Sequence, residues 1–596
     1  MYQNKDYHLS SLSGTKVSSA AIDQRVIVLR WVFVVLLILL TGNVFRRQVL
    51  EAPHYRALAK DQQTAKITSQ PERGRIYAYD QTASDFGVTS ASENNNFFPL
   101  ATNIMMFDVW VVPRNLKDPE DSARILAEKL SLDAAKLLPE FQSGKLYIPP
   151  IAKRIDKVKA EEIADLNIRG VITVPNPVRF YPETEMAAQT IGFVNYDGAG
   201  SSGIEKYYDN ELKGVPGVIY GLKDTKGRVI GVNDQAKAQN GVDLVLTLDS
   251  TVQFMAEREL KSSIEKYGAS GGTIIIAEPK TGRVLAMANS PSYDPNKFNE
   301  VSQEEQWKFL NTAVSDVYEP GSIFKPLIMA AAIDASLVEP DTKPDDLPGG
   351  FKNMVTINGY EIHNSQDKSF GYETMTQVLE NSDNIGMIWV GDKVGNDILG
   401  KYLTNFGIGV KTGVDLGAEG VGKLSEATKW NDVGRATISF GQGVSVTPIQ
   451  ILAAYMALAN NGKLVKLHIL DTIISPSGEE KKIETTEVRD VIKPETAAKI
   501  KEMLVSVVER GHGKKAAVAG FRVAGKTGTA QIPKKDGPGY EENTHIGSFA
   551  GFAPADDPKF VMLVKLDSPA NVEWAESSAA PAFGTIAKWL LTNYYR

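Results

Sequence analysis

The most continuous apolar segment of the chain runs from Val26 to Phe45 and is interrupted only by one arginine and a few small or polar residues. An apolar helix of about 20 residues is long enough to cross the hydrocarbon core of a bilayer. No small-x-small cleavage site follows the segment, and Arg46 and Arg47 come directly after it. This pattern favours an uncleaved anchor over a cleaved signal peptide. We therefore predict one transmembrane helix over residues 26–46.

Cationic residues flank this segment on both sides. Four precede it or lie in its first half and two follow it: Lys5, Lys16, Arg25 and Arg30, then Arg46 and Arg47. Because an excess of Lys and Arg marks the cytoplasmic side of a membrane helix, the count favours a cytoplasmic N-terminus. Residues 1–25 are then a cytoplasmic tail, and the chain beyond the helix is extracytoplasmic.

Between residues 47 and 240 the hydrophobic pattern breaks into short pieces separated by turns that contain Gly and Pro. The segment from Met106 to Val112 has the composition of a strand, and Ser122 to Leu130 has the spacing of a helix. This alternation predicts an elongated region of mixed α/β structure over residues 47–240.

A second domain is predicted over residues 241–596. The largely apolar run from Asp243 to Asp249 leads into Ser250, the expected N-cap, and apolar residues then recur at helical spacing until Gly268. Four further strands and a final helix are expected at both ends of the domain: Thr273 to Ala277, Val284 to Ala288, Ile546 to Phe552, Lys559 to Leu566, and a helix through Trp589. A sheet built from both ends, with helices inserted between them, gives an α+β layer architecture.

Composition and charge exclude several classes of function. The chain is 43% hydrophobic and 23% charged, and its net charge of −7 comes from interspersed acidic and basic residues without a basic stripe. Nucleic acid is therefore not an expected partner. Cysteine is absent, which excludes thiol nucleophiles and thiolate metal sites, and the six histidines do not cluster at metal-ligand spacing. We predict no metal and no cofactor.

A Ser-x-x-Lys spacing places a hydroxyl and an amine one helical turn apart, where a neutral lysine can accept the serine proton. The pattern occurs four times: Ser13/Lys16, Ser263/Lys266, Ser322/Lys325 and Ser365/Lys368. The first precedes the membrane segment, the second lies in a charged amphipathic helix and the last in a polar run, so all three are expected on the surface. Context therefore favours the Ser322 pair.

Ser322 follows the turn Pro320-Gly321 and precedes Pro326 and an apolar helix. Proline is tolerated in the first helical turn, so the helix must begin close to Ser322. There the helix dipole favours negative charge, the Ser322 N–H can face an oxyanion, and burial beside cations would lower the pKa of Lys325. The alternative is an N-cap serine beside a solvated lysine.

A Ser-x-Asn unit occurs at Ser382-Asp383-Asn384, where the Ser382 hydroxyl could relay a proton and the Asn384 amide could hold a substrate carbonyl. By itself this signal is weak, because Ser92-Glu93-Asn94 also fits and a turn of small polar residues is the alternative.

Lys-Thr-Gly occurs three times, beginning at Lys280, Lys411 and Lys526. The first lies in a turn between two strands, and the second lies in a glycine-rich run. Only the third is strand-like, with small residues that let a peptide approach an edge. There Lys526 and Thr527 can hold a terminal carboxylate, Gly528 leaves room for the substrate backbone, and the Thr529 N–H can complete an oxyanion hole.

In chain order, Ser-x-x-Lys, Ser-Asp-Asn and Lys-Thr-Gly-Thr resemble the motif set of penicillin-interacting serine enzymes. The surroundings are similar to those of class B penicillin-binding proteins, the monofunctional peptidoglycan D,D-transpeptidases. Examples are Tyr318-Glu319-Pro320-Gly321 before the nucleophile and Ser439-Phe440-Gly441-Gln442-Gly443, while Pro71 to Tyr77 and Gly203-Ile204-Glu205 resemble that family's non-catalytic pedestal.

The resemblance implies a single-pass protein of the inner (plasma) membrane that crosslinks stem peptides through a serine acyl-enzyme. Ser322 would attack the penultimate D-alanine carbonyl, Lys325 would take its proton, and Ser382, Lys325 and Lys526 would handle protons when an acceptor amine attacks. It also implies covalent inhibition by β-lactams. Because no segment resembles a glycosyltransferase domain, a SEDS-type glycosyltransferase and other divisome proteins are the implied partners.

Several rival functions remain to be compared with this one. A β-lactamase would need an efficient deacylating water and no long pedestal, a membrane β-lactam-sensing receptor would need more membrane spans, and a dead scaffold would not keep all three motifs. An elongation-specific transpeptidase is the nearest alternative, and the stretch from Gly547 to Pro554 favours the septal type.

Overall fold

The computed structural model describes residues 19–56, 64–69, 71–80, 97–146, 148–223, 229–534, 537, 539–572 and 574–595. Ser13 and Lys16 lie outside the described residues. The chain forms two compact units, Met1–Gln70 with Pro216–Ala238, and Pro71–Val215 with Gln239–Arg596. The first unit contains the apolar segment, and the second contains every predicted site residue.

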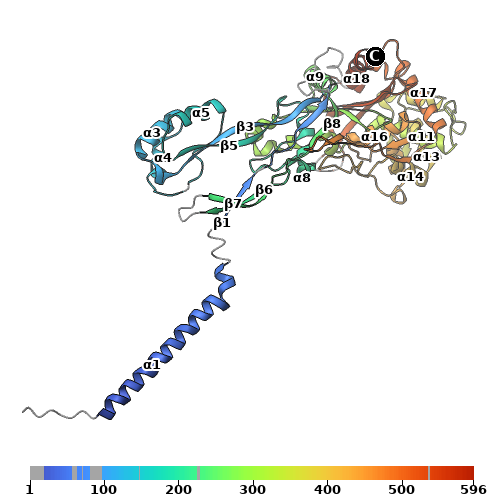
Figure 1. Ribbon diagram of the computed structural model, residues 1–596. Coiled ribbons are helices and arrows are strands. Elements are labelled where there is room, and N and C mark those ends of the chain that lie inside the picture. Colours follow the sequence, from blue (N-terminus) through green and yellow to red (C-terminus); the bar gives the residue numbers. More distant parts are fainter. Residues whose placement is uncertain are drawn as a thin grey trace, which may run out of the picture. The chain divides into compact units, whose positions relative to one another are not determined.

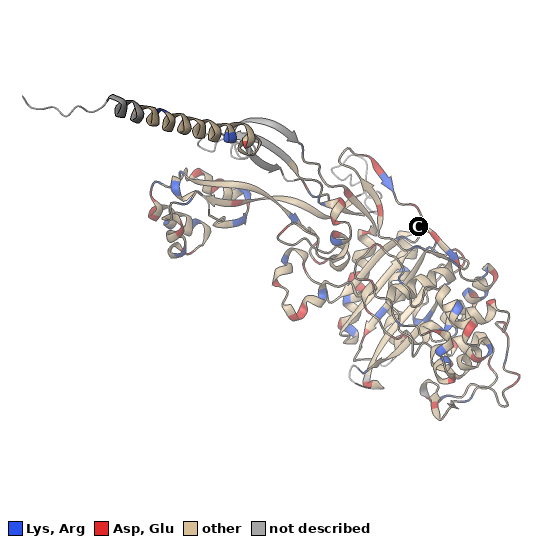
Figure 2. Ribbon diagram, turned by 90° about the horizontal axis from the view of Figure 1, so that it is seen from below, with Lys and Arg blue, Asp and Glu red and all other residues tan. Residues whose placement is uncertain are grey.

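The apolar segment of the first unit is a single helix, α1 (Ser19–Phe45), continued by the π-helical turn η1 (Arg46–Leu50). Val26–Leu50 has a mean hydropathy of 2.3 and none of it is buried, and the ribbon carries few charged positions over this length (Figure 2). One N-terminal helix is therefore long and apolar enough to span a membrane, as predicted. The same unit holds an antiparallel sheet of β1 (Thr64–Ser69), β6 (Gly217–Lys223) and β7 (Val229–Ala236).

A five-stranded antiparallel sheet forms the centre of the second unit, and it is built from both ends of the domain as the sequence predicted. In sheet order the strands are β10 (Val284–Ser290), β9 (Gly271–Ala277), β19 (Phe560–Asp567), β18 (Tyr540–Ala553) and β17 (Ala524–Pro533). The order leaves β17, which carries Lys526, at one edge.

Successive residues of the strands pack on opposite faces of this sheet. Ile274 and Ile276 join one core with α9 (Ser250–Tyr267) and α18 (Ala579–Trp589), whereas Ile275 joins a second core with α11 (Lys325–Asp334) and α16 (Pro448–Ala459). A strand buried on both faces has no polar side to alternate with, which explains the continuous apolar runs in the sequence. The α+β class is confirmed, with helices in layers on both faces.

The insert between β10 and β17 is largely helical and lies around α11 and α13 in Figure 1. Besides α11 and α16 it contains α10 (Thr312–Ser315), α12 (Met375–Glu380), α13 (Asn384–Val394), α14 (Asn396–Asn405), α15 (Asp432–Ser439) and α17 (Pro494–Glu509). It also contains two short antiparallel pairs, β11 (Met354–Ile357) with β12 (Tyr360–His363) and β13 (Lys463–Val465) with β16 (Glu487–Asp490).

Two local predictions in the first helix of the domain are wrong. The N-cap of α9 is Asp249, not Ser250, because the Asp249 carboxylate accepts the N–H groups of Thr251 and Val252. Ser263 is buried rather than exposed, since it lies on the face of α9 that packs on the sheet, and its hydroxyl contacts Glu259. Its partner Lys266 is exposed at the end of the helix.

A second sheet joins the two halves of the chain. Strand β8 (Asp243–Asp249) pairs in parallel with β2 (Ile76–Tyr79) and antiparallel with β14 (Leu470–Ile474), so segments from both halves meet on it. The remaining strands are β15 (Glu480–Lys482), β3 (Phe97–Val111), β4 (Ala152–Ile155) and β5 (Val171–Phe180). The predicted boundary at residue 240 thus falls just before a strand that both halves share.

Strands β3 and β5 form a long antiparallel ribbon that carries a small core of its own at one end. This core is built with α3 (Pro119–Leu130), α4 (Ala134–Phe141) and α5 (Lys157–Asp165), which lie together in Figure 1. Short helices at the other end of the ribbon lead back to β8: α6 (Ala188–Ile191), α7 (Gly203–Tyr207) and α8 (Asp209–Leu212).

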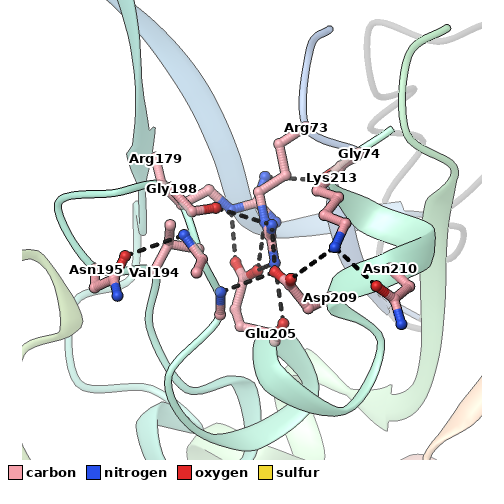
Figure 3. Close-up of polar contacts among 12 residues, drawn as sticks. Arg73, Gly74, Arg179, Val194, Asn195, Gly198, Glu205, Asp209, Asn210 and Lys213 are labelled. Atoms are coloured by element: carbon pink, nitrogen blue, oxygen red, sulfur yellow. Dashed lines mark hydrogen bonds and ion pairs between the residues drawn. The ribbon is translucent and has the colours of Figure 1, made fainter. Parts of the chain in front are cut away.

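A buried carboxylate ties these segments together. Glu205 of α7 is completely buried, and its two oxygens accept from the Arg73 Nε at 2.8 Å and the Arg179 Nε at 2.6 Å (Figure 3). Arg73 also bonds Asp209 at 2.8 Å, and Arg179 bonds the Gly74 carbonyl at 2.7 Å. One buried charge therefore joins the chain before β2, the strand β5 and the helix α7.

Removing this carboxylate is expected to destabilise the second unit. The change Glu205→Ala leaves two nearly buried guanidinium groups without their counter-charge, a situation that costs about 3–5 kcal/mol. We expect a lower Tm and faster limited proteolysis between β2 and β8 in the detergent-solubilised full chain, with the exposed Glu211→Ala as control. Equal melting of both variants would show that the charge network is not structural.

Candidate active site

Ser322 lies in a 3₁₀ turn, η5 (Gly321–Phe324), that leads directly into α11. Pro326 is in the first turn of α11, where its missing N–H has no intrahelical partner, so the helix begins where the sequence predicted. All ten residues of α11 are buried, and the Tyr455 hydroxyl donates to the Ile323 carbonyl at 2.7 Å. The turn that presents Ser322 is thus fixed from both sides.

The Lys325 side chain is completely buried and reaches the Ser382 loop. Its Nζ lies 2.6 Å from the Ser382 carbonyl oxygen, 2.7 Å from Asn384 Oδ1 and 3.2 Å from Ser382 Oγ. The first two are acceptors only, so they take two N–H donors of the amine. A neutral Lys325 then has its lone pair left to receive a hydroxyl proton.

The Ser382 loop is held by side chains on each side of it. The Asp383 carboxylate caps α13 by accepting the Ile385 and Gly386 N–H groups, and the Asn364 Oδ1 accepts the Asn384 N–H at 2.7 Å. Ser382 itself has a φ of 54°, a left-handed conformation that a non-glycine residue keeps only when its surroundings enforce it.

Lys526 approaches the same hydroxyl from strand β17. Its Nζ lies 3.0 Å from Ser382 Oγ and 3.2 Å from the Thr527 carbonyl oxygen, and its side chain is completely buried. Ser382 Oγ therefore lies within hydrogen-bonding distance of two lysine amines. The structure brings together the predicted residues of three distant sequence motifs.

Gly528 and Thr529 continue β17 beside the nucleophile turn. A Cβ on Gly528 would lie 2.7 Å from Ser548 Oγ and 2.9 Å from Ile323 Cγ2, so only glycine permits the strand to pack this closely. Thr529 Oγ1 accepts the Ala575 N–H at 3.1 Å. Gly528 thus acts through close packing and is not among the residues that line the cleft, whereas Thr527 and Thr529 are.

Burial controls the protonation of both lysines. Desolvation, and then the charge of Lys526, hold the pKa of Lys325 well below its ordinary value, with Asp383 acting in the opposite direction. Desolvation lowers the pKa of Lys526 to about 7, and the negative charge of Glu576 opposes this shift. At neutral pH the Lys325 amine is therefore available as a base.

These groups meet at a cleft of about 370 Å³. The half-buried Ser322, together with Ser382, Asn384, Thr527 and Thr529, lines it, while the two lysines lie behind this surface. The cleft is large enough for a peptide segment, and β17 offers it a free sheet edge.

The competing motif copies lie elsewhere, with one exception. The first Lys-Thr-Gly is the turn between β9 and β10, and the second lies in a loop where Thr412 donates to Glu419. Ser365, expected on the surface, is half-buried and lines the cleft. The adjacent Asn364 is buried because it supports the Ser382 loop.

Several cleft residues have no sequence motif and were not predicted. They lie on β12, α15 and β17 and in the turns that follow α15, α17 and β19, which only the fold brings to the cleft: Glu361, His363, Thr437, Phe440, Gln442, His512, Gln531, Trp574 and Glu576. Of these, only Phe440 and Gln442 lie in a run that carried the family resemblance, although no role was predicted for them, and the Gln442 Nε2 donates to Gln531 Oε1 at 3.2 Å.

Two family models match the chain. The model described as penicillin binding protein transpeptidase domain covers residues 272–588, and the one described as penicillin-binding protein dimerisation domain covers residues 68–246. Among curated relatives, stage V sporulation protein D of Bacillus subtilis is 34% identical over 580 residues, spanning 96% of this chain and 86% of the relative. The peptidoglycan D,D-transpeptidase FtsI of Escherichia coli is 32% identical, spanning 82% of this chain and 80% of the relative.

Solved structures show the same similarity. Penicillin binding protein 3 from Mycobacterium tuberculosis, complexed with aztreonam, is 26% identical with a TM-score of 0.67, covering 89% of this chain and 97% of that chain. A peptidoglycan synthetase from Bifidobacterium adolescentis is 26% identical with a TM-score of 0.70 and the same coverage.

The depressed pKa of Lys526 predicts a pH-dependent stability. Between about pH 7 and the unfolded-state pKa near 10.4 the unfolded chain binds more protons than the folded chain, so the stability penalty of this buried lysine shrinks as pH rises. The variant Lys526→Met should therefore melt at a higher temperature than the native chain. Its advantage should fall by about 2–3 kcal/mol from pH 6 to pH 9. Melting curves in detergent at both pH values test this, and a constant advantage would contradict the low pKa.

Proposed function

The chain belongs to the class B penicillin-binding proteins, the peptidoglycan D,D-transpeptidases that crosslink cell-wall stem peptides, and from this premise we propose that Ser322 is its acylating nucleophile. The observation that carries the proposal is the buried amine of Lys325, one turn from Ser322, with two of its hydrogens committed to carbonyl oxygens. A neutral amine in this position is a base poised for a serine hydroxyl.

In the first half-reaction the peptide lies along the β17 edge, with its terminal carboxylate held by Lys526 and Thr527. Ser322 Oγ attacks the penultimate D-alanine carbonyl while Lys325 takes its proton. The backbone N–H groups of Ser322 and Thr529 are the donors that we assign to the developing oxyanion. Terminal D-alanine then leaves, taking up a proton, and an ester to Ser322 remains.

In the second half-reaction an acceptor amine attacks this ester and Ser322 regains its proton. Ser382 Oγ lies 3.2 Å from one lysine amine and 3.0 Å from the other, so a proton can pass between Lys325 and Lys526 through it. Asn384 supports this relay by holding Lys325 and offers an amide to the substrate backbone.

We assign the reaction to the outer face of the inner (plasma) membrane, with residues 1–25 cytoplasmic and α1 as the anchor. This orientation is supported by the flanking cations and by the need to reach peptidoglycan. We further propose a septal role, beside a SEDS-type glycosyltransferase and other divisome proteins. Support comes from the similarity to FtsI and from the Gly547 to Pro554 stretch, while an elongation role is the alternative.

Covalent labelling tests the nucleophile directly. Intact mass spectrometry of the detergent-solubilised chain after exposure to benzylpenicillin should show one adduct of the drug's mass, because a β-lactam acylates the serine that a stem peptide would. The Ser322→Ala variant should show none, and the control Ser365→Ala, at the rim of the same cleft, should label as the native chain does. A native chain without adduct, or undiminished labelling of Ser322→Ala, would refute the proposed mechanism.

A further inference from the structure

Near Lys526 the cleft carries a polar pair that the acylation chemistry does not use. His512 lies in the turn after α17 and Glu576 in a 3₁₀ turn after β19, η9 (Ala575–Ser577), and both line the cleft together with Trp574. His512 Nδ1 lies 2.9 Å from Glu576 Oε2, and the two side chains are 38% and 39% exposed. They are thus bonded to each other and open to the cleft.

The proposed function places the acceptor in this part of the cleft. If Lys526 and Thr527 hold the carboxylate of the terminal D-alanine, the leaving amine departs on their side of Ser322. By microscopic reversibility the attacking amine must enter where the leaving amine left. Both His512 and Glu576 line the cleft, and Lys526 lies close enough to interact electrostatically with each of them, so we place them beside that route.

On this basis, and resting on the proposed function, we propose that Glu576, His512 and Trp574 form an acceptor subsite that binds the primary ammonium group of a neighbouring stem peptide. Glu576 supplies the counter-charge. Its Oε2 accepts the hydrogen bond from His512, and its Oε1 is available to bind the ammonium group. The indole of Trp574 supplies an aromatic surface of the kind that favours cations.

His512 gives this subsite a base as well as a binding group. Its Nδ1–H donates to the Glu576 carboxylate, which in the neutral ring leaves Nε2 as an acceptor. The charged groups around it are Glu576, Lys526 of β17 and Lys368 beyond β12, and its backbone N–H donates to the Glu380 carbonyl. Burial and the two lysines lower the pKa of His512, against the effect of Glu576, so the ring is neutral at physiological pH.

The proton balance of the transfer is then complete. The bound ammonium gives one proton to His512 Nε2, and the resulting amine attacks the ester carbonyl. The new C–N bond forms, the C–O bond to Ser322 breaks, and the second amine proton passes to Ser322 Oγ through the Ser382 relay. His512 returns its proton to water.

Partition between transfer and hydrolysis tests the subsite in the detergent-solubilised full chain. A D-alanyl thioester donor is supplied with a lysine-containing tripeptide amine as acceptor, and both products are measured beside the rate of benzylpenicillin adduct formation. Glu576→Gln should lower the transfer-to-hydrolysis ratio at least about tenfold, because a charge-assisted hydrogen bond is lost. Thioester hydrolysis and penicillin acylation should fall less than transfer does, because the loss of Glu576 affects them only through the pKa of Lys526.

The control is Glu361→Gln, the same loss of charge at another residue that lines the cleft, and it should keep the native ratio. His512→Gln should lower transfer at pH 7 and recover toward the native rate at pH 9, where free amine is abundant. An unchanged ratio in Glu576→Gln would overturn the subsite. An equal loss of acylation would also overturn it, since Glu576 would then act through Lys526. Absence of any penicillin adduct in the native chain would instead refute the proposed function itself.

Discussion

Two buried amines that share one hydroxyl are the constraint on which the active site depends. Ser382 Oγ lies 3.2 Å from Lys325 Nζ and 3.0 Å from Lys526 Nζ, and neither lysine is accessible to solvent. Two full positive charges at this separation would repel strongly in a medium of low dielectric. The arrangement persists because desolvation holds the pKa of Lys325 well below its ordinary value and lowers the pKa of Lys526 to about 7, so the two amines need not be charged together. The neutral form of Lys325 is also what makes it useful as a base. The feature that costs stability is the one that permits catalysis.

Packing around the site provides the stability that the two desolvated lysines and the left-handed Ser382 do not. Helix α11 is buried along its whole length, the turn before it is bonded to Tyr455, and Gly528 lets β17 pack against that turn. Ser382 is held in a left-handed conformation between the Asp383 cap and Lys325. Far from the cleft, the buried carboxylate of Glu205 joins the segments that lead into β8. Rigid surroundings thus fix a strained and poorly solvated centre.

Much of this fold could be predicted from the pattern of apolar residues alone. The strands β8, β9, β10 and β19 lie within two residues of their predicted bounds, because a strand buried on both faces leaves an unbroken apolar run. The two wrong predictions in α9 concern the position of its N-cap and the burial of one side chain. Asp249 caps α9 in place of its neighbour because a carboxylate at that position reaches two N–H groups, and Ser263 is buried because a small hydroxyl fits the face that packs on the sheet.

The residues of the candidate site also fall into two groups, those that local sequence could predict and those that only the fold brings together. Spacing within a helix or strand is encoded locally, so Ser322, Lys325 and the Lys526 motif could be selected by their context. The rim of the cleft has no local code, because His512 and Glu576 are separated by 64 residues and meet only after β17, β18 and β19 have formed the sheet. The buried centre and the rim of the cleft also have different functions. The groups that break and make the ester bond must be buried to tune their pKa values, whereas a group that receives a second peptide must remain open to solvent. Residues of the second kind are held by loops at a sheet edge, and only a three-dimensional structure shows which loops those are.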